Sequence, residues 1–76
     1  MKDFQYKILF LVINKYTNII VEKSNYYSKN YIDAHNFIMK YTNESTTYTY
    51  DKDNNFIAKD DNSKNINFKL IIPYNY

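Results

Sequence analysis

Few side chains in this sequence are suited to catalysis, and the first to consider is His35, the only histidine. Nucleophilic catalysis by a Ser–His–Asp arrangement needs a nucleophile and a carboxylate placed beside the imidazole. The strained turn that presents a nucleophilic serine in many hydrolases needs glycine, and the chain has no glycine. We therefore expect His35 to be a partly buried residue of a helix, and the protein not to be an enzyme.

A spacing typical of calcium ligands occurs at Asp51-x-Asp53-x-Asn55. An EF-hand loop continues with a glycine at its sixth position and a bidentate glutamate at its twelfth. Those two positions hold Phe56 and Asn62 in this chain. The sequence therefore predicts a solvated hairpin turn here rather than a calcium site.

Missing residue types exclude several other kinds of site. The absence of cysteine excludes disulfides, thiolate catalysis and zinc–thiolate centres. The absence of glycine excludes the glycine-rich loops that bind phosphate groups. The neighbouring carboxylates Asp60 and Asp61 lie in a polar segment, where solvated acidic residues are the ordinary case. We expect neither a metal nor a cofactor.

Length and composition describe a single folded domain over residues 1–76. Hydrophobic residues make up 45% of the chain and aromatic residues 20%, more than disordered chains contain. No run reaches the roughly 18 apolar residues of a membrane-spanning helix. The apolar run at 8–13 is also short for a signal peptide. We expect a cytoplasmic protein that does not contact membranes.

The unusual composition has a genetic interpretation. Asparagine, lysine, isoleucine and tyrosine are abundant, and their codons are rich in A and T. Glycine, alanine, proline and arginine have GC-rich codons and are scarce or absent. The bias indicates a low-GC genome, so the missing arginine is weak support for any functional interpretation.

Apolar periodicity predicts an α+β fold with elements in the order ββαβββ. The expected sheet is small and antiparallel-rich, with one helix packed on one face. We expect strands at about 3–13, 19–26, 45–51, 56–59 and 66–72, and a helix at 31–43. Turns at 14–18 and 51–55 and a polar loop at 60–65 separate the strands. In such turns asparagine takes the positive φ angles that glycine usually adopts.

The helix is expected to be capped by Ser28 or Asn30, with Asp33 in its first turn. It joins the second and third strands, which should therefore run parallel to each other. The first strand is the most apolar and is expected to lie centrally. At about 100° per residue, one apolar stripe forms along the helix. Its members are Tyr31, Ala34, Phe37, Ile38 and Tyr41, with Ile32 and Met39 beside them.

One short helix covers one face of a sheet, yet the first strand is apolar on both faces. We expect a protein partner or a second copy of the chain to cover the excess. Twisting of the sheet and the C-terminal residues 73–76 are the alternative cover. Tyrosine suits interfaces because it offers contact area and a polar tip at low entropic cost. The candidate interface residues are Tyr26, Tyr27, Tyr31, Ile32, Met39, Tyr74 and Tyr76.

The expected function is that of a small, non-enzymatic protein-binding module, acting as a homodimer or within a complex. Its size and composition are typical of phage or mobile-element proteins that inhibit a host machine such as bacterial immunity, an anti-CRISPR-like role in the host cytoplasm. The alternative is a small nucleic-acid-binding regulator. Lysine–tyrosine neighbours at 15–16 and 40–41 favour that alternative. A net charge of only +2 and the absence of arginine weigh against it.

Overall fold

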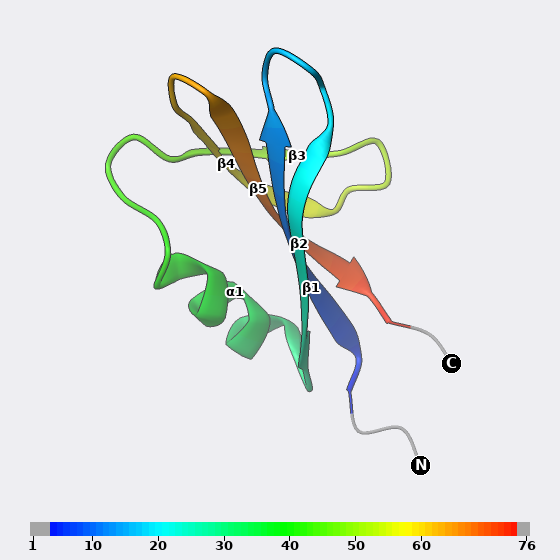
Figure 1. Ribbon diagram of the computed structural model, residues 1–76. Coiled ribbons are helices and arrows are strands. Elements are labelled where there is room, and N and C mark those ends of the chain that lie inside the picture. Colours follow the sequence, from blue (N-terminus) through cyan, green and yellow to red (C-terminus); the bar gives the residue numbers. More distant parts are fainter. Residues whose placement is uncertain (1–3, 75–76) are drawn as a thin grey trace.

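The computed structural model describes residues 4–74, which form a five-stranded sheet with a helix against one of its faces (Figure 1). The expected α+β class and the order ββαβββ are confirmed. The elements are β1 (Tyr6–Asn14), β2 (Ile20–Ser28), α1 (Tyr31–Met39), β3 (Thr47–Tyr50), β4 (Phe56–Asp61) and β5 (Asn65–Pro73).

Neighbouring strands are all antiparallel, and their order across the sheet is β2-β1-β5-β4-β3. β1 is an interior strand, as expected, but the middle position belongs to β5. The ladder between β1 and β5 runs from the pair Tyr6–Pro73 to the pair Asn14–Asn65. β2 and β3 point the same way, yet they form the two opposite edges of the sheet. The helix therefore connects one edge to the other.

Asparagine replaces glycine where the turns require a left-handed backbone. Asn18 has φ 58° in the turn between β1 and β2, and Asn54 has φ 64° in the turn between β3 and β4. Asparagine tolerates this region better than most residues other than glycine. The prediction that asparagine takes over the role of glycine in these turns is confirmed.

α1 begins at its asparagine cap and ends four residues before the expected end at residue 43. The side chain of Asn30 accepts a hydrogen bond from Asp33 N at 2.8 Å. Beyond Met39, Thr42 Oγ1 donates to the carbonyl of Met39. Asn43 Oδ1 accepts from Ser45 N at 2.7 Å. Such local bonds compete with helical ones, which explains why the chain leaves the helix here.

The polar loop expected at 60–65 is shorter than predicted, because β4 extends to Asp61 and β5 begins at Asn65. The side chain of Asn62 accepts hydrogen bonds from the backbone nitrogens of Lys64 and Asn65. Asn62 therefore closes a tight turn with its own side chain, and the flanking residues become free to join the ladder.

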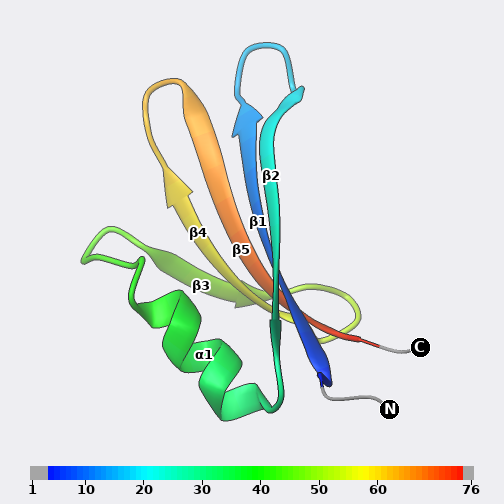
Figure 2. The ribbon, with the colours of Figure 1, turned by 60° about the horizontal axis from the view of Figure 1, so that its bottom comes forward.

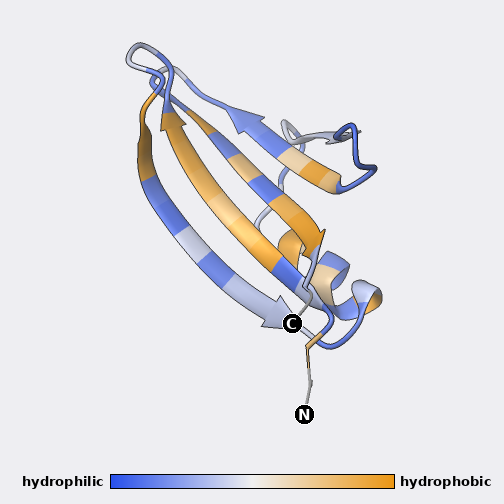
Figure 3. Cartoon of the chain, turned by 90° about the vertical axis from the view of Figure 1, so that its right-hand side faces the viewer, coloured by the Kyte–Doolittle hydropathy of each residue, from blue (hydrophilic) through white to orange (hydrophobic). Residues whose placement is uncertain are grey.

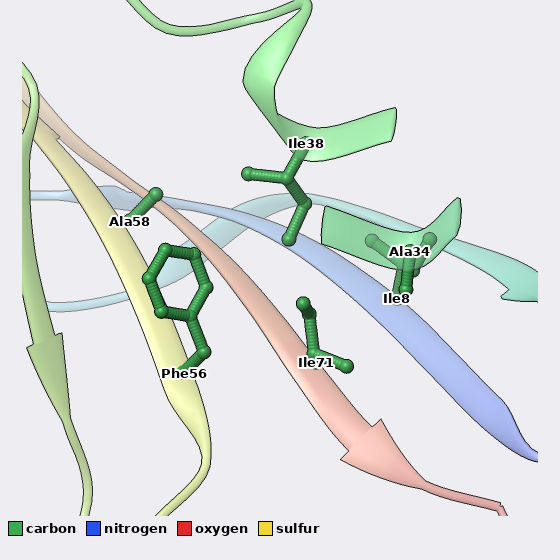
Figure 4. Close-up of a cluster of buried hydrophobic side chains, with 6 residues drawn as sticks. All are labelled: Ile8, Ala34, Ile38, Phe56, Ala58 and Ile71. Atoms are coloured by element: carbon green, nitrogen blue, oxygen red, sulfur yellow. The ribbon is translucent and has the colours of Figure 1, made fainter. Parts of the chain in front are cut away.

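The hydrophobic core lies between α1 and one face of the sheet (Figures 2 and 4). Its largest fully buried side chains are Ile8, Ile38 and Ile71. Burial of such a side chain contributes about 1.5–3 kcal/mol. Because α1 packs on this face of the sheet, it leaves the opposite face uncovered. The buried core residues are Ile8, Ala34, Ile38, Phe56, Ala58 and Ile71.

Candidate protein-contact surface

The sheet face turned away from α1 is apolar because two interior strands carry apolar residues on both sides. In β1, Ile8 and Phe10 pack in the core with the helix. Side chains alternate along a strand, so Leu9, Leu11 and Ile13 point to the opposite face. Figure 3 shows the hydrophobic character of β1 along most of its length. We call this second face of the sheet the open face.

The neighbouring strand β5 has the same property with the opposite parity. Ile71 is buried in the core, so the odd positions of β5 face the helix. The even positions therefore lie on the open face, and all of them are apolar. These residues are Ile66, Phe68, Leu70 and Ile72.

Strand register joins these side chains into one continuous stripe. Leu11 lies directly opposite Phe68, and Leu9 lies directly opposite Leu70. Ile57 of β4 is opposite Leu70 on its other side, which widens the stripe to three strands. All members are only half-buried, and within residues 4–74 no helix covers them. The apolar stripe comprises Leu9, Leu11, Ile13, Ile57, Ile66, Phe68, Leu70 and Ile72.

Polar residues border the apolar stripe on both sides. Lys23 of β2 lies opposite Leu11, and Lys59 of β4 lies opposite Phe68. Asp61, the acidic member of the border, forms an ion pair with Lys15 at 2.6 Å. The hydrogen bond from Lys15 holds the pKa of Asp61 below its ordinary value. An apolar centre with a polar rim is the usual anatomy of a protein interface.

The residues that the sequence indicated as interface candidates lie on several different surfaces. Tyr26 belongs to the helix side, where its ring packs 5.1 Å from Phe10. Tyr31 also lies there, 5.7 Å from the ring of Tyr6. Both are therefore partly used in internal aromatic contacts.

Two further candidates meet at the end of the open face. The rings of Tyr27 and Tyr74 are 4.9 Å apart, next to the start of β1. Within the described residues, the C-terminal segment therefore reaches this end of the face through Tyr74. Tyr76 lies outside the described residues.

The last two candidates, Ile32 and Met39, lie on the helix outside the core. Ile32 is 71% exposed, whereas its neighbours in the core, Ala34 and Ile38, are fully buried. Sequence reasoning noted the two-sided β1 but missed the apolar stripe as the larger surface. The signal that identifies the stripe is an apolar residue at every even position of 66–72, considered together with the apolar odd positions of β1.

An apolar groove of about 570 Å³ lies beside the edge strand β2. Its lining includes Ile8, Tyr26 and Phe37 from the helix side and Tyr27 from the other side. Asp33 and Lys29 also line it, so a carboxylate and an ammonium lie at its border. The groove extends the apolar surface of the protein along β2.

The residues with catalytic potential are engaged in packing and turns. His35 is half-buried, and its ring lies 5.1 Å from the ring of Phe56. Asp51 Oδ1 accepts hydrogen bonds from the backbone nitrogens of Asp53 and Asn55. The bond from Asn55 is the main cause that lowers the pKa of Asp51. The expected hairpin turn is confirmed, and its carboxylate is occupied by the turn itself.

In the described part of the chain, no three His, Cys, Asp or Glu side chains come together to hold a metal. No helix between residues 4 and 74 is long and apolar enough to cross a bilayer. No protein-family model, curated protein or solved structure matches this chain. The functional argument therefore depends on the open face itself.

Proposed function

We propose that this protein is a non-enzymatic protein-binding module whose contact surface is the apolar stripe of the open face. The observation that carries the proposal is the continuity of the stripe across β1, β5 and β4, which no helix of residues 4–74 covers. Large contiguous apolar patches on small proteins mark interaction sites. Each 100 Å² of such surface removed from water contributes about 2.5 kcal/mol before the entropic costs of association are subtracted.

The chemistry of the stripe supports a protein partner over a nucleic acid. Single-stranded nucleic acids bind sheets by stacking bases on aromatic rings. Phe68 is the one aromatic member of the stripe, and the others are leucine and isoleucine. The feature that favours nucleic acid is the set of lysines around the stripe. These are Lys23 and Lys59 on its two sides and Lys7 at the start of β1. Binding to phosphates through them would weaken steeply as salt rises.

The biological setting follows as a further part of the proposal. A small module without catalytic groups, encoded by a low-GC gene, fits a phage or mobile-element inhibitor of a host machine in the host cytoplasm. Expression of the chain in bacteria that carry an immune system should raise phage plating, and the Phe68→Glu variant should abolish the effect. Equal plating with and without the chain would contradict the inhibitor role.

Site-specific photo-crosslinking tests the contact surface directly. A photo-reactive phenylalanine analogue at Phe68 should form covalent adducts with protein in cells that express the chain. The same analogue at Tyr16 is the control, because Tyr16 is 80% exposed in the β1–β2 turn and lies outside the stripe. Adducts at position 68 but not at position 16 are the expected result. No protein adduct at position 68 would contradict the proposed function.

A further inference from the structure

We propose that the occupant of the open face is a second copy of this chain. The two copies pack face to face and form a homodimer with the layers α–β–β–α. The inference rests on the proposed function, because it names the partner of the same apolar stripe. It also explains how a chain of 76 residues with a one-sided core completes its burial.

The open face is complementary to itself. A two-fold symmetric dimer needs one patch that matches its own copy. The stripe runs along the middle strands β1 and β5, with its cross-strand pairs Leu9–Leu70 and Leu11–Phe68 at the centre of the face. It contains no charged side chain, so a copy rotated by 180° brings apolar residues onto apolar residues.

The charged residues of the face lie where water can still reach them in the dimer. Lys23 is on the edge strand β2, and Lys59 is on β4 at the other side of the stripe. Lys7 is at the start of the interior strand β1, opposite Ile72 at one end of the stripe. Long lysine side chains can lay their methylene groups on apolar surface while the ammonium stays in water. Asp61 already has Lys15 as its ion-pair partner at 2.6 Å. Face-to-face packing therefore buries no uncompensated charge, which would be costly.

The area of the face supports a weak, concentration-dependent dimer. The strands have four to nine residues. At about 3.3 Å per residue and about 4.8 Å between strands, they give a flat footprint of about 600 Å². Two copies would remove about 1,200 Å² from water if the whole sheet face were buried, which is the lower limit of a stable interface. Because the border of the face stays in water, the buried area is smaller, and the dimer is expected to dissociate on dilution. Edge-to-edge pairing of two copies through β2 would leave the apolar stripe in contact with water, so it would not complete the burial of this surface.

Sedimentation equilibrium of the purified full chain tests the inference. The wild-type chain should sediment at twice its mass of 9.3 kDa, in a concentration-dependent equilibrium. The Phe68→Glu variant should sediment as a monomer, because it places a carboxylate at the centre of the interface. Ile32→Glu is the matched control, since Ile32 is exposed on the outer face of the helix, and this variant should remain a dimer.

A second measurement covers the case in which Phe68→Glu fails to fold. The chain has no cysteine of its own, so Leu11→Cys introduces a single thiol into the stripe. A maleimide reagent should label this thiol slowly at high protein concentration and rapidly on dilution. Ile32→Cys should be labelled at one rate throughout. A labelling rate at Leu11→Cys that does not depend on protein concentration would overturn the inferred dimer.

The outcomes separate this inference from the proposed function. A purified wild-type chain that stays monomeric from micromolar to millimolar concentration overturns the dimer, as does a dimer that Phe68→Glu leaves intact. If the purified chain is monomeric but position 68 crosslinks to a different protein, the dimer is wrong and the binding module stands. If position 68 forms no adduct and the chain is monomeric, both are wrong.

Discussion

Lys69 Nζ lies 3.5 Å from Asp60 Oδ2 on the helix side of the sheet, and both side chains are largely removed from water. Thr46 Oγ1 donates a hydrogen bond to the other carboxylate oxygen at 2.6 Å. The ammonium of Lys69 also lies 5.4 Å from the centre of the Phe10 ring. A charged pair is thus built into the margin of a small core, where each charge depends on its partner.

Removal of one charge from this pair should cost more than removal of both. Asp60→Asn leaves the Lys69 ammonium uncompensated and should lower the free energy of unfolding by about 3 kcal/mol. The double variant Asp60→Asn, Lys69→Met should recover most of that loss, because no buried charge remains. Urea unfolding of the wild type, both single variants and the double variant measures the coupling. Purely additive losses would contradict the interpretation of the pair.

Truncating one side chain on each face of α1 should distinguish its buried face from its exposed face. Ile38→Ala removes a fully buried side chain from the core and should cost about 2–5 kcal/mol. Ile32→Ala alters an exposed side chain on the same helix and should change stability by less than about 0.5 kcal/mol. Thermal and urea unfolding measure both variants. Losses of similar size would mean that the helix is oriented differently.

The turn at Asn54 should respond to backbone conformation rather than to side-chain contacts. Asn54 has a φ of 64°, which is unfavourable for alanine and neutral for glycine. Asn54→Ala should lower the free energy of unfolding by about 1 kcal/mol, whereas Asn54→Gly should stay close to the wild type. Urea unfolding measures the stability of both variants. Equal stability of the alanine and glycine variants would contradict the prediction.

The pKa of Asp51 predicts a contribution to stability that depends on pH. The hydrogen bond from Asn55 is the main cause that lowers this pKa below its ordinary value of 3.8 in the folded protein. A lowered folded-state pKa stabilises the fold above the unfolded-state value, and the contribution disappears as pH falls through the folded-state value. Asp51→Asn retains a side-chain acceptor for the turn but removes the charge.

Urea unfolding of the wild type and of Asp51→Asn between pH 7 and pH 2 checks this contribution. The wild type should have its full advantage at neutral pH, and the advantage should shrink at pH values below 3.8. A constant difference between the two proteins across this range would show that the Asp51 charge makes no contribution to the turn.

Much of the fold could be predicted from local signals. The asparagine-rich turns, the cap at Asn30 and the alternation in β1 and β5 depend on neighbouring residues, so periodicity and turn chemistry identify them. The end of α1 at Met39 could not be predicted in the same way. The apolar pattern continues to Tyr41, whose ring packs on Phe10 at 5.3 Å, although the residue lies beyond the helix. Tyr41 therefore packs on the core from the loop after α1, although its spacing in the sequence is that of a residue on the apolar stripe of a helix.

The sequence by itself determined the class of the fold, the two-sided apolar character of β1 and the absence of residue types needed for thiol, phosphate-loop and guanidinium chemistry. Alternation also determined that Ile66, Phe68, Leu70 and Ile72 share a face. Only the tertiary structure decided which face that is. β1 and β5 pair across most of the chain length, as Tyr6 with Pro73, and their register sets the parity of each strand against the helix. The helix then covers Ile8 and Ile71, and the longer apolar row of β5 remains on the open face.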